Sequence, residues 1–136
     1  MKKQSRSEAR REAFSLIFQM NQQKDTMEEL VKELGEEKPE CLDNMEYIRA
    51  VVLGVMEREE ELEDIIRKSL TTAWSIDRIN KVPLAVLKLA VYEMKYMDDV
   101  PPKVAINEAV NIVKEYGDTQ AAAFVNGVLA GALEKI

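Results

Sequence analysis

The sequence contains no histidine and only one cysteine, and both shortages narrow its chemistry. Without histidine the chain cannot form a Ser-His-Asp or Cys-His catalytic arrangement, most kinds of zinc site, or a histidine proton shuttle. Cys41 cannot form an internal disulfide, which favours an intracellular protein, and its sequence neighbours include no cation that would make the thiol reactive. We therefore expect a protein that is not an enzyme and has no cofactor and no bound metal.

Long hydrophobic runs are also missing. The longest uncharged apolar run is Val82–Leu87, whereas a membrane-spanning helix needs roughly 20 apolar residues. The basic start Met1–Lys3 is not followed by the apolar region of a secretory signal, because charged residues interrupt residues 6–12. These features predict a soluble, cytoplasmic protein without a membrane partner.

The composition is that of a globular protein, with 46% hydrophobic and 32% charged residues. A chain of 136 residues buries about two-thirds of its unfolded surface, so one domain spanning residues 1–136 is expected. The acidic run formed by Glu57 and Glu59–Glu61 lacks the loop residues of a calcium site. We interpret this run as a solvated face.

Charge is distributed unevenly along the chain, whose formal net charge is −6. Residues 1–24 carry a balance of +4, residues 25–70 a balance of −9, and residues 71–136 a balance of −1. The acidic average therefore hides a basic N-terminal segment that is suited to nucleic acid. The candidate contacts in this segment are Lys2, Lys3, Arg6, Arg10 and Arg11.

Cations at the start of a helix oppose the helix dipole, which suggests an anionic partner. A solvated helix start is the alternative interpretation of the same residues. Charge alone does not decide between the two.

Apolar residues recur with helical spacing throughout, which predicts an all-α fold. We expect about seven helices in two packed bundles that form one compact domain, with helical halves at about 1–70 and 75–136. The first helix is expected to start at Ser5, which has the capping-box spacing to Glu8. The other expected segments are 26–34 (stopped by Gly35), a loop at 35–42, 43–70 with a break near 57–61, a short turn at 75–80, a buried central helix from Pro83 to Met97, 102–116 and 119–134.

Several motifs are similar to those of one known family. Residues 81–94 read KVPLAVLKLAVYEM, residues 100–110 read VPPKVAINEAV, residues 124–129 read FVNGVL, and the first expected helix contains ARREAFSLIF. Together they resemble, in order and over the whole chain, the NusB family of transcription antitermination factors. The resemblance implies an all-helical, non-enzymatic RNA-binding adaptor.

The resemblance also implies partners. Family members pair with ribosomal protein NusE and bind boxA-like single-stranded RNA in nascent ribosomal RNA transcripts. That complex joins RNA polymerase with other Nus factors and suppresses premature termination. A homodimer formed through the RNA surface is a further hypothesis, which rests on family analogy.

The resemblance places Arg6 and Arg10 on the RNA surface and adds Phe18 and Phe124 as aromatic candidates. Exposed aromatic rings stack on single-stranded bases, although such residues are more often part of the core. The chain departs from the family pattern where Arg6-Ser7-Glu8 replaces three consecutive arginines and where Ala121–Ala123 precedes Phe124. These departures leave open an alternative function, a helical protein-interaction module that has weakened or lost RNA binding.

Overall fold

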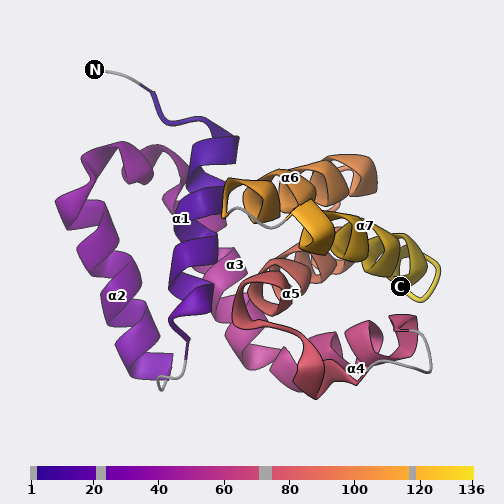
Figure 1. The fold of residues 1–136 in the computed structure, drawn as a ribbon. Helices are drawn as coiled ribbons and strands as arrows, with labels where there is room; N and C mark the ends of the chain where they lie inside the picture. The colour runs from indigo at the N-terminus through magenta and orange to yellow at the C-terminus, as the bar shows by residue number, and fades with distance from the viewer. Residues whose placement is uncertain (1–2, 21–23, 71–74, 117–118) are drawn as a thin grey trace. The chain divides into compact units, whose positions relative to one another are not determined.

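A computed structural model describes residues 3–20, 24–70, 75–116 and 119–136. These residues form seven α-helices, two short 3-10 helices and no strand, which confirms the predicted all-α class (Figure 1). The chain folds as two compact units, unit 1 from Met1 to Glu57 and unit 2 from Arg58 to Ile136. The elements of unit 1 are α1 (Arg6–Phe18), α2 (Lys24–Glu37), η1 (Pro39–Asn44) and α3 (Met45–Glu57). Those of unit 2 are α4 (Glu59–Ser69), η2 (Ile76–Arg78), α5 (Lys81–Tyr96), α6 (Pro102–Glu115) and α7 (Thr119–Leu133).

The start of α1 is fixed by the predicted capping box. The Ser5 hydroxyl accepts a hydrogen bond of 3.0 Å from the Glu8 backbone N–H, and the Glu8 carboxylate accepts one of 3.0 Å from the Ser5 N–H. Two of the backbone donors at this helix end are thereby satisfied. The apolar face of α1 packs on α3, which also packs against α2. The side chains that form this core include Ala9, Ala13, Phe14, Ile17, Ile48, Val51, Val52 and Val55.

The second helix differs from its prediction at both ends. It begins at Lys24, before the expected Thr26, and it continues through Gly35 to Glu37. Gly35 does not stop the helix; the absence of a side chain at this position instead makes room for Met45 of α3 and Leu42 of η1. A Cβ at Gly35 would lie 2.9 Å from Met45 Cε and 3.2 Å from Leu42 Cδ2. The expected loop at 35–42 is likewise partly wrong, since residues 39–44 form a 3-10 helix.

Unit 2 is built around α5, which packs against α4, α6 and α7. The expected break near residues 57–61 is confirmed, because α3 ends at Glu57 and α4 begins at Glu59. The helix expected from Pro83 begins two residues earlier, at Lys81 after the N-cap Asn80. Nine residues of α5 are buried, which confirms that it is the central helix of this half. Within the described residues no helix is long and apolar enough to cross a membrane.

The acidic run at the start of α4 stays at the surface, as predicted, but two of its members also pair with α5: the side chains of Glu59 and Glu61 are 44% and 37% exposed. Glu59 lies 2.9 Å from the Lys88 ammonium, and Glu61 lies 2.8 Å from that of Lys95. The Glu61 carboxylate also accepts a hydrogen bond from the Tyr96 hydroxyl. These contacts attach α4 to the central helix and lower the pKa of Glu61, first through the Lys95 hydrogen bond and then through that of Tyr96.

This lowered pKa predicts a pH dependence of stability. A carboxylate whose folded pKa lies below its ordinary 4.5 stabilises the fold above that value, and the contribution is lost as the pH falls through the folded pKa. The difference in unfolding free energy between wild type and Glu61→Gln should therefore be largest at neutral pH and shrink as the pH falls below 4.5. Urea titrations at each pH measure it. Glu60→Gln, at an exposed neighbour, is the control, and an equal pH dependence of both differences would contradict the assignment.

Candidate nucleic-acid interface

The N-terminal segment before α1 is attached to η1 by side-chain hydrogen bonds. The Gln4 backbone N–H donates to Asp43 Oδ2 at 3.1 Å, and Asn44 Nδ2 donates to the Gln4 carbonyl at 3.1 Å. The Gln4 side chain bonds both Asn44 and the Cys41 sulfur. Lys3 is exposed, and the residue that follows it, Gln4, is held in place by these hydrogen bonds. Burial raises the pKa of the Cys41 thiol, which agrees with the predicted lack of reactivity.

Arg6 is exposed and held from two sides. Its Nε donates a hydrogen bond of 3.1 Å to Asn44 Oδ1, and its guanidinium carbon lies 4.3 Å from the centroid of the Tyr47 ring. Asn44 and Tyr47 therefore restrict the rotamers of Arg6 while its side chain stays at the surface. A guanidinium ordered in advance loses less entropy when it binds a phosphate.

The other predicted cations have different surroundings. Arg10 is only 4% exposed and lies against the same ring, 5.6 Å from its centroid. Arg11 is half-buried and donates to the Ser7 hydroxyl at 2.6 Å and to the Ser7 carbonyl at 3.0 Å. Lys2 lies outside the described residues. Lys3 and Arg6 are thus each exposed, whereas Arg10 and Arg11 contact other groups of the protein.

Phe18 lies at the last position of α1, where its ring is stacked toward Phe14 and still partly open. It is 44% exposed, and the two ring centroids are 6.0 Å apart at an interplanar angle of 32°. The ring is therefore accessible to a base from one side.

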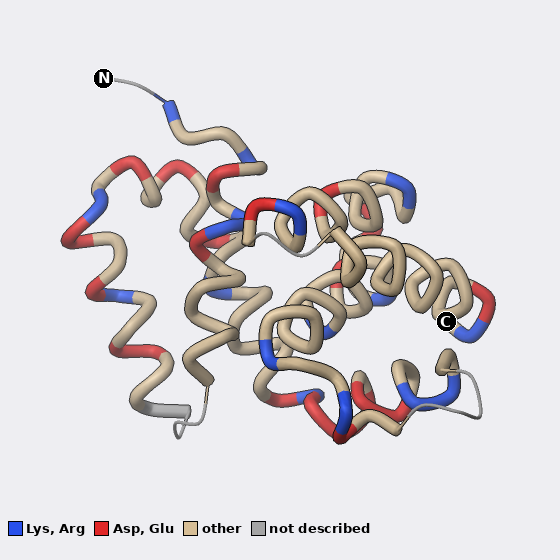
Figure 2. The backbone as a smooth tube through the Cα atoms, viewed as in Figure 1, with Lys and Arg blue, Asp and Glu red and all other residues tan. Residues whose placement is uncertain are grey.

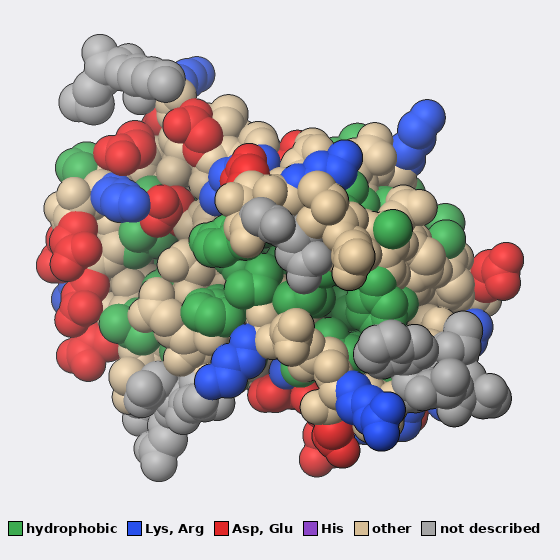
Figure 3. Space-filling model, viewed as in Figure 1, with side chains coloured by type: hydrophobic (Ala, Val, Ile, Leu, Met, Phe, Trp, Pro, Cys, Tyr) green, Lys and Arg blue, Asp and Glu red, His purple; other side chains and the backbone are tan. Residues whose placement is uncertain are grey.

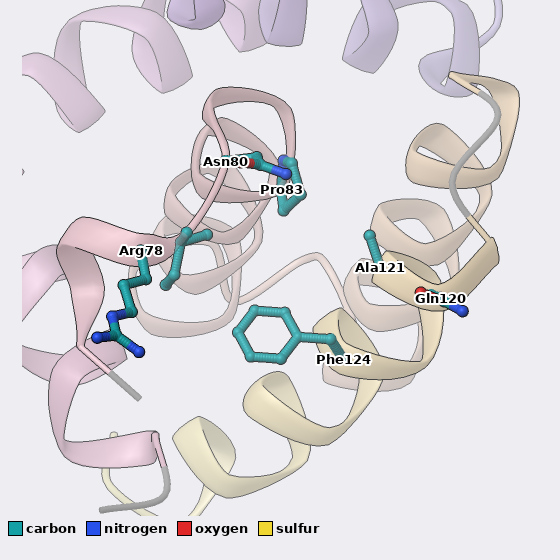
Figure 4. A pocket seen from close by; sticks show the side chains of 7 residues that line it. Arg78, Asn80, Pro83, Gln120, Ala121 and Phe124 are labelled. Carbon is teal, nitrogen blue, oxygen red and sulfur yellow. The ribbon is translucent and has the colours of Figure 1, made fainter. Parts of the chain in front are cut away.

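Phe124 lines a hollow in unit 2 where α7 faces η2 and the start of α5. Its ring points into this space, and Arg78, Asn80 and Pro83 face it from the other side (Figure 4). Hydrophobic side chains are visible at the surface between α5 and α7 (Figure 3). The hollow has a volume of about 270 Å³ and is lined by Arg78, Ile79, Asn80, Pro83, Gln120, Ala121 and Phe124. An aromatic face beside a guanidinium and two amides can stack on a nucleobase and bond its edge.

Sequence reasoning identified the aromatic member of this hollow and missed its polar members. Gln120 lies four residues before Phe124 on one helix face, a spacing that could have indicated it. Arg78 and Asn80 come from the turn after residue 75, and no sequence pattern links them to α7. Asn44 and Tyr47 were missed for the same reason, since their contacts with Arg6 join residues about 40 positions apart. Within the described residues no group of three potential metal ligands occurs.

The family model, the curated relatives and the solved structures that are similar to this chain all belong to one family. The sequence matches the NusB family over residues 7–134. The transcription antitermination protein NusB of Listeria innocua is 40% identical over 125 residues, 92% of this chain and 93% of that protein. Its counterpart in Acetivibrio thermocellus is 42% identical over 124 residues, covering 91% of this chain and 85% of that protein.

Solved structures show the same fold. T. maritima NusB superposes with a TM-score of 0.79 at 31% identity, covering 98% of this chain and 94% of that one. A crystal structure of antitermination factors NusB and NusE in complex with dsRNA gives a TM-score of 0.80 at 32% identity, covering 96% and 97%. With the family match across residues 7–134 and relatives at 40% and 42% identity over more than 90% of its length, this chain belongs to the NusB family.

Proposed function

We propose that this chain is a transcription antitermination factor that works as a non-enzymatic adaptor, binding RNA together with ribosomal protein NusE. The proposal is supported by family membership and by a relative whose crystal structure contains NusE and RNA. The RNA we propose is a boxA-like element of a nascent ribosomal RNA transcript. The complex would act on RNA polymerase with other Nus factors, in the cytoplasm, and it needs no cofactor.

The observation that carries this proposal is the arrangement of Lys3 and Arg6 at the entry to α1. Arg6 is exposed, yet its side chain is held by Asn44 and Tyr47. Holding a cation at the surface serves little purpose for folding, because an exposed charge contributes at most about 1 kcal/mol to stability. It does serve phosphate binding, because a guanidinium that is already held in place loses less entropy when it pairs with an anion.

Phe124 and its hollow in unit 2 supply the second proposed contact, for a base rather than a phosphate. Phe18 is the corresponding aromatic candidate in unit 1. We propose that both units serve one RNA-binding domain over residues 1–136. Because Arg10 is only 4% exposed, we propose that it supports the site through packing and does not contact RNA directly. We also propose that Lys2 and Arg11 contact RNA.

Removing the two exposed cations tests the proposal. The double substitution Lys3→Ala with Arg6→Ala should weaken RNA binding by roughly 30-fold, taking about 1 kcal/mol for each phosphate contact. The slope of log affinity against log salt should become shallower by about 1.4, since each contact on a single strand contributes about 0.7. Fluorescence anisotropy with a boxA-like single-stranded RNA, with and without NusE, measures both quantities.

A matched control removes the same charge elsewhere. Lys103→Ala with Lys135→Ala deletes two exposed cations of unit 2 and should leave the salt slope nearly unchanged. Equal losses in both double variants would contradict the site. If the wild type binds no RNA even with NusE present, the alternative function, a protein-interaction module, is favoured. If it binds a duplex more tightly than the single strand, the RNA ligand is double-stranded. A dimer that persists in size-exclusion measurements while RNA binds would contradict a homodimer formed through this surface.

A further inference from the structure

The Phe124 hollow of unit 2 has a single charged lining residue, Arg78. Of the seven residues that line it, four are apolar, two carry amides and none is acidic. The α7 side of the hollow adds no charge, because α7 contains no Asp, Glu, Lys or Arg from Thr119 to Leu133 (Figure 2). One guanidinium therefore sets the electrostatic character of the lining.

The Arg78 side chain is available for a ligand. The backbone N–H of Arg78 donates a hydrogen bond of 3.0 Å to the Ser75 carbonyl, which fixes the η2 turn. The side chain is exposed, and within the described residues no hydrogen bond or ion pair engages its guanidinium. An arginine side chain carries only donors. Arg78 thus has a fixed backbone and a full set of uncommitted donors beside the hollow.

Asn80 is also available, because it does not cap the helix that it precedes. It occupies the N-cap position of α5, where an Asn side chain usually accepts a hydrogen bond from the N–H of the second or third helical residue. The third residue here is Pro83, which has no N–H, and the Asn80 side chain makes no capping hydrogen bond. The Asn80 amide instead lines the hollow, on the same turn as Arg78 (Figure 4).

The hollow suits a base better than a phosphate. Its volume of about 270 Å³ lies just below that of pockets for drug-sized ligands, which begin at about 300 Å³, so it fits a small planar group. A phosphate would have to leave water for a lining that is mostly apolar. A base that stacks on the Phe124 ring would instead present its edge to Arg78, which faces the ring across the hollow (Figure 4).

The donors of Arg78 select among the four bases. A guanidinium bonds most strongly where two adjacent acceptors take its two parallel N–H groups. Guanine offers such a pair in O6 and N7. Adenine and cytosine place an amino donor beside the acceptor, and a donor N–H separates the two carbonyls of uracil. The side-chain oxygen of Asn80 can also accept from the guanine N1–H, which adjoins O6.

We propose that the Phe124 hollow is a guanine-specific subsite of the RNA surface. Arg78 donates two hydrogen bonds to O6 and N7 of the base that stacks on Phe124, and Asn80 accepts from the N1–H of the same base. The inference rests on the proposed function, in which this ring holds a base, and adds the identity of that base. Arg78 is the residue that determines the specificity.

Short RNAs that differ in one base test the preference. The probes are fluorescent oligouridines of about eight nucleotides whose central residue is guanosine, adenosine, cytidine or uridine. With NusE present, the wild type should bind the guanosine RNA at least about fivefold more tightly than the other three, which is the discrimination of one bidentate contact. Arg78→Ala should bring all four RNAs to a similar affinity. Arg78→Lys should recover little of the preference, because an ammonium keeps the charge but lacks the planar fork.

A matched control removes an arginine elsewhere in unit 2. Arg67→Ala deletes an exposed arginine of α4 that does not line the hollow, and it should leave the guanine preference unchanged. Because a base edge is uncharged, Arg78→Ala should also leave the slope of log affinity against log salt unchanged. Urea denaturation of each variant checks that the fold is intact, which the exposure of Arg78 leads us to expect.

Mononucleotides provide a second readout that needs neither NusE nor the other RNA contacts. GMP, AMP, CMP and UMP share the same ribose and phosphate, so differences among them report on the base alone. At equal millimolar concentration, GMP should cause the largest NMR shifts in the amide signals of η2, the start of α5 and α7, and Arg78→Ala should abolish the excess. If the wild type binds no RNA, the proposed function fails, and this measurement still decides the present inference.

Several outcomes would overturn the inference. Equal binding of the four RNAs, preference for another base, or a guanine preference that survives Arg78→Ala would each contradict it. An equal loss of affinity for every RNA in Arg78→Ala, with a salt slope shallower by about 0.7, would assign Arg78 to a phosphate instead. Shifts from GMP that do not exceed those from AMP would show that the hollow does not select guanine.

Discussion

Replacing Arg10 by alanine is expected to lower the free energy of unfolding by about 2–4 kcal/mol, a large fraction of a typical domain's stability. Arg10 is 4% exposed in unit 1, and its guanidinium lies over the buried Tyr47 ring. Truncation removes the packing of its stem and leaves the groups around the guanidinium without their partner. Urea denaturation followed by circular dichroism gives the value, and hydrogen exchange locates the loss in α1 and α3.

Arg6 is the comparison that makes this prediction informative. Arg6→Ala removes an exposed side chain beside the same ring and should change the unfolding free energy by no more than about 1 kcal/mol. Arg10→Lys keeps the charge but lacks the planar donor fork, so it should recover only part of the stability. If Arg10→Ala unfolds like the wild type and loses RNA affinity as Arg6→Ala does, then Arg10 is an RNA ligand and the supporting role is wrong.

Arg10 also illustrates why local features were predictable and distant ones were not. The Ser5–Glu8 capping box is a relation between residues three apart, so spacing was sufficient to identify it. The burial of Arg10 depends on Tyr47, 37 positions away, and no periodicity reveals such a contact. In a single sequence Arg6 and Arg10 are equivalent cations four residues apart on one helix. In the structure Arg6 is exposed, whereas Arg10 is buried against Tyr47 of α3.

The prediction that Gly35 stops the helix was wrong, and the pairing of Glu61 was not predicted, for a related reason. A glycine after an apolar stripe is a common helix stop, but here it accommodates Met45 and Leu42 from the following segments. An acidic run interrupted only by Arg58 is typical of a solvated face, and the sequence does not show that Lys95 and Tyr96 reach Glu61 from α5. In both cases a partner brought by packing outweighs local preference, while the number and order of the helices follow from periodicity alone.

The largest expected effect on RNA binding is that of Phe124→Ala. If a base stacks on this ring, its loss costs about 1–3 kcal/mol, which corresponds to a decrease in affinity between about 5-fold and about 150-fold. Phe124 is half-buried at the edge of its hollow, so fold stability should change much less than for a core phenylalanine. Anisotropy titrations with the boxA-like RNA measure the affinity, and urea denaturation of the same preparation checks the fold.

Controls for this variant distinguish the loss of base stacking at Phe124 from the loss of an exposed aromatic residue elsewhere and from the loss of a phosphate contact. Phe124→Trp should retain most of the affinity because the indole offers a larger π-face, whereas Phe124→Leu should behave like alanine. Tyr116→Ala removes a 59% exposed aromatic at the end of α6 and should leave affinity unchanged. A stacked base is neutral, so Phe124→Ala should leave the salt slope intact, unlike Lys3→Ala with Arg6→Ala. If the leucine variant binds RNA as tightly as the wild type, Phe124 contributes packing alone and the base must be held by another group.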